Sequence, residues 1–150
     1  MKLFLLLCWM VLIFSFSMES GAISREKSNS LTIWISERLV RKDLSLEEKE
    51  KYIEKYDFYI RKAAHLGIYF ILGLLTMSTF LEFDLKRTLF YAILFVFLYA
   101  CSDEIHQLFV NERSGQIQDV FLDTLGATLG IILYHIVNQY LVLRKKHIIQ

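Results

Sequence analysis

The sequence contains no proline and only two cysteines, and its charges nearly cancel. Cys8 and Cys101 both lie inside apolar runs, without the spacing of a disulfide framework or a metal-binding motif, so we interpret them as buried thiols. The net charge of +1 excludes the basic footprint of a nucleic-acid-binding protein. Charged residues make up only 22% of the 150 and apolar residues 55%, which argues against an ordinary soluble domain.

Long stretches without charged residues indicate an integral membrane protein. A membrane-spanning helix needs about 20 mostly apolar residues. Residues 63–81 and 124–143 meet this length, and residues 89–102 reach it when they are extended to 108. The sequence therefore predicts one all-α membrane bundle over residues 1–150. Its transmembrane helices are expected to number about four, at approximately 3–18, 63–81, 89–108 and 120–143.

The first apolar run has a second interpretation. Lys2, the apolar residues that follow it and Ser20-Gly21-Ala22 also have the pattern of a secretory signal peptide with a small-residue cleavage site. The bulky Trp9 and Phe14 favour a helix that is retained in the protein. Cleavage stays open as the alternative.

Basic residues near the span ends predict the orientation. Four spans place both termini and the turn after residue 81 on one side of the membrane, and the short loop with Arg113 on the other. The basic residues of the first side are Lys2, Lys86, Arg87, Arg144, Lys145 and Lys146. Because basic short loops stay in the cytoplasm, we expect both termini there and residues 19–62 outside.

The polar segment 19–62 is expected to be helical. Its residues Leu31, Trp34, Ile35, Arg38 and Leu39 have the spacing of one helix face. Further along, Ser45 followed by Glu48 is the pattern of a capping box. We expect an amphipathic hairpin on the outer bilayer surface, and the alternative is a lid over the polar residues described next.

In this topology, the strongly polar residues at membrane depth gather on the outer side. They are Glu19, Arg61, Lys62, His65, Asp103, Glu104, His106, Gln107, Arg113, Asp119 and Asp123. Helical spacing places Asp103, His106 and Gln107 on one face. Mutual pairing is their simplest role, because unpaired charges are costly in a low-dielectric bundle.

Two binding roles also stay open for this cluster. Arg61, Lys62 and Arg113 could hold a phosphate or carboxylate at headgroup depth. A divalent metal is the second option, although no tight ligand motif is present and no other cofactor is expected. The candidate metal ligands are Asp103, Asp119, Asp123 and His65.

Catalysis is a further alternative. Glu104 or His106 could act as a general base on a lipid-linked phosphate or sugar if its environment held its pKa near the working pH. Catalysis therefore stays an alternative, and the leading interpretation is a protein that does not act as an enzyme.

Small residues predict close helix packing. Gly126 and Gly130 form a small-xxx-small face on the last span. Packing within the same bundle is the main interpretation, and pairing with a second copy or another membrane protein is the alternative. Gly67 and Gly73 are expected to serve packing as well.

The order of these residues resembles the VanZ-like family. The resemblance covers nearly the whole chain, with two departures at Glu19, where Gln is frequent, and at Asn111-Glu112, where Pro-Gly is frequent. The matching segments are Ile13–Gly21 with Ser24 and Ser28, Arg61–His65 with Tyr69, Ser102–Gln107 with Phe109, Arg113 and Ser114, and Asp119-Val120 with Asp123–Ala127.

The resemblance implies a small multi-pass protein of the bacterial cell membrane. The family's founding member is associated with resistance to the lipoglycopeptide teicoplanin, with much less effect on vancomycin, and the mechanism in the family is not established. We therefore expect reduced teicoplanin susceptibility through binding or shielding at the outer membrane face. The expected partners are the bilayer and either a lipid-linked cell-wall precursor or the drug. A membrane enzyme and a structural membrane partner remain the alternatives.

Overall fold

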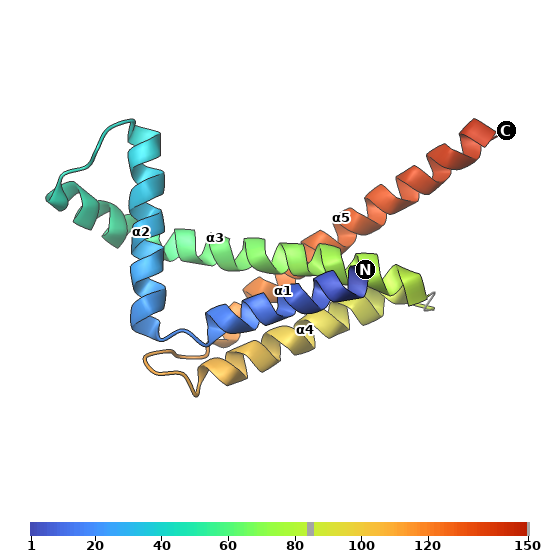
Figure 1. Ribbon diagram of the computed structural model, residues 1–150, viewed down its shortest axis with the longest axis horizontal. Helices are drawn as coiled ribbons and strands as arrows, with labels where there is room; N and C mark the ends of the chain where they lie inside the picture. Colours follow the sequence, from blue (N-terminus) through green and yellow to red (C-terminus); the bar gives the residue numbers. More distant parts are fainter. Residues whose placement is uncertain (84–85, 150) are drawn as a thin grey trace.

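The computed structural model describes residues 1–83 and 86–149, with side chains as far as Lys145. Over these residues the chain is helical throughout, without a strand (Figure 1). The elements are α1 (Lys2–Ser17), α2 (Gly21–Val40), α3 (Leu46–Phe80), a short 3-10 helix (Leu81–Phe83), α4 (Thr88–Gln107) and α5 (Ile117–Ile149). The predicted all-α membrane bundle is confirmed.

Three of the described helices are long and apolar enough to cross a membrane, namely α3 with the turn after it, α4 and α5. Helix α1 has only 16 residues, which is about 24 Å of helix and less than the roughly 30 Å hydrocarbon core. Helix α1 is long enough for a membrane span only when it is counted together with α2, and a bend of 105° separates the two helices. The described residues therefore contain three candidate spans, or four if the bent pair counts as one.

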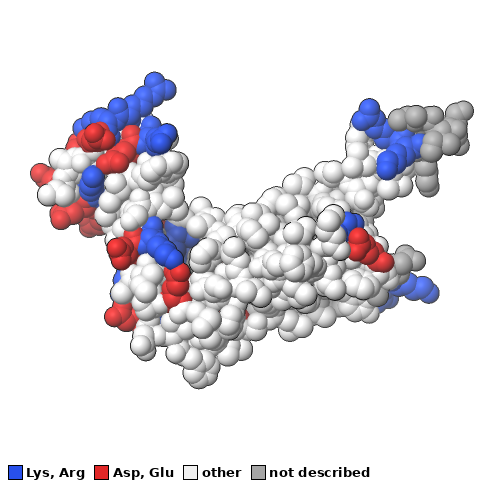
Figure 2. Space-filling model, viewed as in Figure 1, with Lys and Arg blue, Asp and Glu red and all other residues white. Residues whose placement is uncertain are grey.

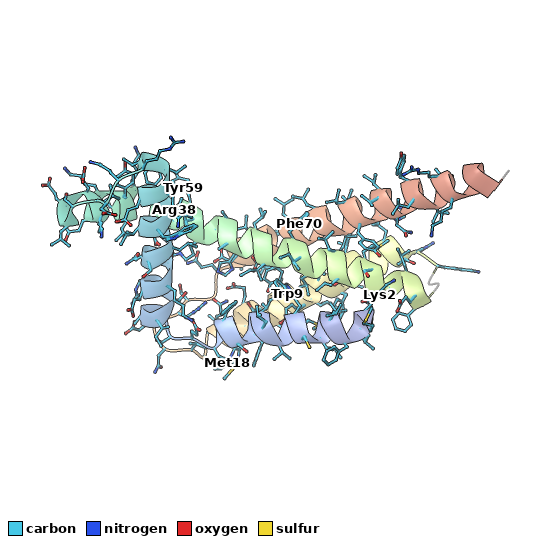
Figure 3. The ribbon with its side chains drawn as sticks, turned by 45° about the horizontal axis from the view of Figure 1, so that its top comes forward. Lys2, Trp9, Met18, Arg38, Tyr59 and Phe70 are labelled. Carbon is cyan, nitrogen blue, oxygen red and sulfur yellow. The ribbon has the colours of Figure 1, made fainter. Side chains whose placement is uncertain are left out.

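Helix α1 is nevertheless part of the bundle. It lies alongside α3 and α4, and Trp9 points from it toward α3 (Figures 1 and 3). The indole Nε1 of Trp9 donates to the carbonyl of Ile68 at 3.0 Å, and the Tyr99 hydroxyl donates to the carbonyl of Met10 at 2.7 Å. Leu6 and Ile13 are buried. These contacts support the retained helix over the cleaved signal peptide.

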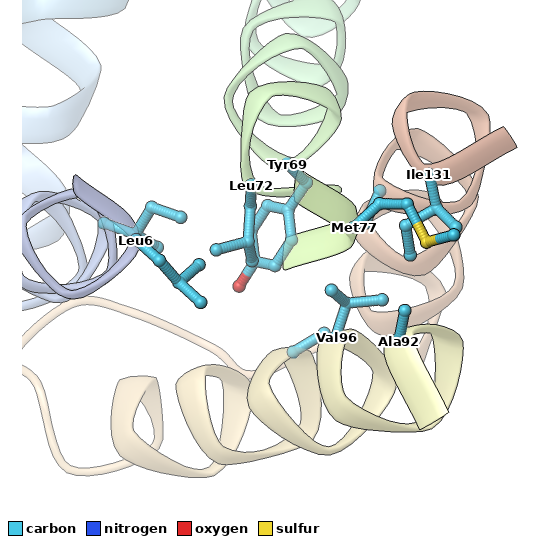
Figure 4. Close-up of a cluster of buried hydrophobic side chains, with 10 residues drawn as sticks. Leu6, Tyr69, Leu72, Met77, Ala92, Val96 and Ile131 are labelled. Carbon is cyan, nitrogen blue, oxygen red and sulfur yellow. The ribbon is translucent and has the colours of Figure 1, made fainter. Parts of the chain in front are cut away.

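The core lies where α1, α3, α4 and α5 meet. Its buried side chains include Leu6 of α1, Leu72 of α3, Val96 of α4 and Ile131 of α5 (Figure 4). Tyr69 is buried in the same cluster. Side chains from four helices therefore share one apolar centre, which fixes how the polar ends of these helices are placed.

Glycines bring α3 and α5 into backbone contact. A Cβ on Gly73 would lie 1.9 Å from the carbonyl oxygen of Ala127, and one on Gly130 would lie 2.1 Å from that of Phe70. Gly126 approaches α3 in the same way, at 2.5 Å from the carbonyl oxygen of Leu66. The face of Gly126 and Gly130 is thus occupied within the bundle. The expectation for Gly67 is wrong, because a Cβ there would meet nothing within 4 Å.

The polar segment forms two crossing helical arms. The predicted capping box is present, since Ser45 Oγ accepts from the backbone N–H of Glu48 and the Glu48 side chain accepts from that of Ser45. From there α3 runs without a break into the membrane-spanning stretch, so this arm does not lie flat on a bilayer surface, as the hairpin prediction required. Helix α2 crosses α3 (Figure 1).

The apolar stripe of α2 faces outward. Leu31, Trp34 and Leu39 are exposed, whereas the small residues Thr32 and Ser36 are buried. Small side chains at a crossing let two helix backbones approach, which explains why they and not the larger apolar residues are enclosed. The guanidinium of Arg38 lies 5.0 Å from the ring centroid of Trp34.

On the face shown in Figure 2, the charged side chains of the described residues gather at the two ends of the molecule. Figure 2 shows an uncharged belt between a mixed basic and acidic end and an end that is mainly basic. The mainly basic end carries both termini (Figure 1), and there Lys2 pairs with Glu82 at 3.1 Å. Lys146, one of the basic residues counted for this side, has its side chain outside the described residues.

Candidate functional site

The α4–α5 loop clamps the bend between α1 and α2 at the end of the bundle away from the termini. We call residues 17–21 and 108–116 the elbow. Arg113 donates from Nε to the carbonyl of Glu19 at 3.0 Å and from Nη2 to that of Phe16 at 2.9 Å. The backbone N–H of Gly21 donates to the carbonyl of Asn111 at 3.0 Å. A carbonyl in the last turn of α1 and one in the bend after it thereby accept hydrogen bonds from a loop distant in sequence.

Two further features close this clamp. A Cβ on Gly21 would lie 2.0 Å from the carbonyl oxygen of Glu112, so only glycine allows the loop to come this near. The Glu112 carboxylate pairs with Arg25 at 2.7 Å. Burial lowers the pKa of the Arg113 guanidinium, while the carboxylates of Asp103 and Glu19 oppose that shift, and the group stays cationic.

Two adjoining cavities lie at the elbow, each with a volume of about 180 Å³. The bundle cavity lies among α1, α2, α3 and the end of α4. The loop cavity lies against the α4–α5 loop and is lined mainly by polar residues. Five residues line both of them, namely Ser24, Arg61, His65, Gln107 and Arg113.

The bundle cavity has one apolar and one polar side. Its apolar lining residues are Ile13, Phe16, Leu31, Ile60, Ala64 and Ile68. The polar ones that it does not share with the loop cavity are Ser17, Glu19, Lys27, Ser28, Tyr69 and Asp103. An occupant of this space therefore meets hydrocarbon on one side and charge on the other.

A buried polar group without a full set of partners lies in this lining. Asp103 is 4% exposed, and its Oδ2 accepts from Gln107 Nε2 at 3.3 Å. The hydroxyls of Tyr69 and Ser17 lie near this carboxylate. Asp103 Oδ1 and both hydroxyls have no hydrogen-bond partner among the described residues. Buried polar atoms are almost always bonded, so these three groups can pair with one another or with a polar group from outside the chain.

Most of the other charges around the cavities are paired. Lys62 pairs with Asp119, and Lys27 pairs with Glu19. His65 Nδ1 lies 3.5 Å from Asp123 Oδ1, with Asp123 fully buried. Pairing is therefore the role of several members of the predicted cluster. Arg61 differs, because its ion pair with Asp57 on the same helix is 3.7 Å long.

The two candidate general bases lie outside both cavities. The carboxylate of Glu104 accepts through Oε2 from the backbone N–H of Gln116 at 2.8 Å, just before α5 begins. The ring of His106 packs against Phe14 at a centroid distance of 4.5 Å. Asp103 and Gln107 line the bundle cavity, whereas His106 does not, so the predicted common face is divided.

The candidate metal ligands do not assemble into a site. Among the described residues there is no group of three or more His, Cys, Asp or Glu side chains that could hold an ion. Asp119 is paired with Lys62, Asp123 faces His65, and Asp103 is bonded to Gln107. The oxygen ligands that the sequence offers are thus directed to separate partners.

Sequence reasoning missed the contribution of α2. Ser24, Lys27 and Ser28 line the bundle cavity, and Ser28 also donates to Asp57 of α3. Their spacing of three and four residues places them on one helix face, which was the available signal. Tyr69, interpreted only as a core or interface residue, lies one helical turn after His65 and lines the same cavity.

Comparison with known proteins gives one match. The family model described as VanZ/LLP1 matches residues 2–138, which include all the residues that line the two cavities. No curated protein and no solved structure matches the chain.

Proposed function

This chain belongs to the VanZ/LLP1 family, and from that premise we propose that it lowers the susceptibility of a bacterial cell to lipoglycopeptides such as teicoplanin. It does so by binding an amphiphile in the elbow cavities at the outer face of the cell membrane. The amphiphile is either a lipid-linked precursor or the drug itself. Occupation of this site shields the target at the membrane surface.

The observation that carries this proposal is the two-sided lining of the bundle cavity. Apolar residues such as Ile13 and Ile68 line one side, and Arg61 and Arg113 line the side shared with the loop cavity. A molecule with a hydrocarbon part and an anionic part matches both linings. Because teicoplanin carries a lipid tail, it partitions into the bilayer surface where this site is proposed to lie. Vancomycin lacks that tail, which gives the selectivity a physical basis.

The proposed depth rests on α2 and on the basic residues at the other end. Helix α2 is bent away from α1 by 105°, and its exposed Leu31, Trp34 and Leu39 suit the boundary between headgroups and acyl chains. Basic residues near the termini favour a cytoplasmic location for that end. The elbow then lies at headgroup depth on the outside.

Neither alternative function has an observation in its favour. An enzyme acting through Glu104 or His106 would need one of them in reach of a substrate, and neither lines the bundle cavity or the loop cavity. A partner that pairs through Gly126 and Gly130 would need a face that α3 already occupies.

The test is growth inhibition of a susceptible Gram-positive host by teicoplanin and by vancomycin. The host expresses the wild type, Arg61→Gln, the control Lys86→Gln or an empty vector, with abundance followed through an epitope tag. Lys86 is exposed at the end that carries the termini, so its variant removes a charge away from the site. We expect protection against teicoplanin by the wild type and the control but not by Arg61→Gln. A well-expressed wild type that protects against neither drug, or against both equally, contradicts the proposal.

A further inference from the structure

We infer that the two elbow cavities together bind one anionic lipid, a phosphodiester whose headgroup carries a free hydroxyl group. The inference rests on the proposed amphiphile binding and names the class of ligand. Three features of the site carry it: an apolar path for the tail, basic side chains for the phosphate, and a carboxylate with one open oxygen for the hydroxyl.

The tail has a path from the bilayer into the bundle cavity. Phe16 of α1 and Leu31 of α2 both line this cavity and are 44% and 41% exposed, so the lining continues to the outer surface between these helices. Further inside, Ile13, Ile60 and Ile68 continue the apolar lining. An acyl chain that enters beside Phe16 exchanges contacts with neighbouring lipids for contacts with these residues.

The phosphate has basic partners at the shared wall. Basic side chains outnumber acidic ones in the lining of each cavity, and Arg61 and Arg113 line both. Arg113 uses two of its donors for the carbonyls of Phe16 and Glu19. Arg61 has only a long ion pair of 3.7 Å with Asp57, and its side chain is 39% exposed. Its planar guanidinium is therefore available for two parallel hydrogen bonds to a phosphate.

The headgroup hydroxyl donates a hydrogen bond to Asp103. An ionised carboxylate only accepts hydrogen bonds, so the open Oδ1 matches a donor on the ligand. The amide of Gln107 holds Oδ2 at 3.3 Å and fixes the plane of the carboxylate. The nearby hydroxyls of Ser17 and Tyr69 are also unpartnered and can accept or donate. A glycerol or sugar headgroup meets all these requirements.

Other headgroups match less well. An amino headgroup would also donate to Asp103, but it makes the lipid electrically neutral and leaves the excess of basic side chains without a counter-charge. A phosphate ester capped by a methyl group satisfies Arg61 and leaves Asp103 Oδ1 open. A free hydroxyl on an anionic diester is the combination that satisfies both residues.

Binding of short-chain lipids to the purified full-length protein in detergent tests this inference. Native mass spectrometry compares dioctanoylphosphatidylglycerol with dioctanoylphosphatidylmethanol, which has the same charge and tails without a hydroxyl, and with dioctanoylphosphatidylcholine, which is neutral. We expect the glycerol lipid to bind about tenfold more tightly than the methyl ester, as one hydrogen bond to a charged acceptor provides. The choline lipid should bind least. Equal binding of the first two, or choline binding as tight as glycerol binding, overturns the inference.

Variants separate the two contacts. Arg61→Gln should weaken both anionic lipids by the same factor, and Asp103→Asn, which replaces a charged acceptor with a neutral one, should narrow the preference for the glycerol lipid over the methyl ester. Lys86→Gln should change neither. If Asp103→Asn fails to fold, the comparison of the glycerol lipid with the methyl ester on the wild-type protein still tests the inference. A prenyl-diphosphate-linked sugar is then added as a competitor at equal concentration. If it displaces most of the glycerol lipid, the diphosphate-linked sugar binds more tightly, and if it does not, the glycerol lipid binds more tightly.

The outcome is independent of the resistance test. Lipid selectivity in a protein that gives no protection against teicoplanin contradicts the proposed function alone. Protection without preference for the hydroxyl-bearing lipid contradicts this inference alone.

Discussion

Replacing Gly73 with alanine tests the closest approach of α3 to α5. The new Cβ would lie 1.9 Å from the carbonyl oxygen of Ala127, whereas real Cβ atoms essentially never come closer than 3.0 Å. The obstacle is backbone, so the two helices must separate by about 1 Å, and overpacking of this kind costs about 1–3 kcal/mol. Separation also loosens the contacts of Gly126 and Gly130 with α3, which lie on the same interface.

The matched control lies in the same helix. Gly67 has nothing within 4 Å of its would-be Cβ, and alanine is favoured over glycine in a helix by about 1 kcal/mol. The free energy of unfolding in detergent should therefore fall by about 1–3 kcal/mol for Gly73→Ala and stay constant or rise for Gly67→Ala. If the two variants unfold alike, the backbone contact between α3 and α5 is not a determinant of stability, and this reasoning is wrong.

Three further predictions concern the clamp, the first helix and the orientation. Arg113→Lys should lower the free energy of unfolding by about 2 kcal/mol, because an ammonium group cannot reach the carbonyls of both Phe16 and Glu19, and an unchanged thermal midpoint would contradict the clamp. The intact mass of the purified protein should include α1, since Trp9 and Tyr99 bond it to the bundle; a mass that lacks it would favour signal cleavage. With the native cysteines replaced by serine, a membrane-impermeant maleimide should label Asp43→Cys in intact cells and Lys86→Cys only after permeabilisation, and the reverse result would invert the topology.

The apolar helices could be predicted because the free energy of residing in a bilayer follows local composition. For this reason α1 and α4 begin and end close to the expected positions, and α3 ends close to the expected end of the second span. The start of α3 at Leu46 could not be inferred in the same way. A change from polar to apolar composition, as near Ala63, marks where water gives way to lipid and not where a helix begins.

The site could be predicted only in part, because helical spacing does not fix how each helix is rotated against its neighbours. Gln107 lines both cavities, whereas His106, one position earlier, packs against Phe14. The elbow was harder still. Its bend depends on contacts such as Gly21 with Asn111, which are 90 residues apart in the sequence, so no local pattern brings Ser24 and Lys27 to the cavity.

The continuity of α3 links the position of its outer arm to the thickness of the bilayer. Its 35 residues measure about 52 Å, of which about 30 Å fits in the hydrocarbon core, so about 20 Å stands clear of it. The immersed and the emergent parts turn together as one rod. A tilt of about 20°, the average for transmembrane helices, moves the far end sideways by about 7 Å. Helices tilt when the bilayer thins. The position of the outer arm of α3, and of its crossing with α2, therefore changes with the thickness of the membrane.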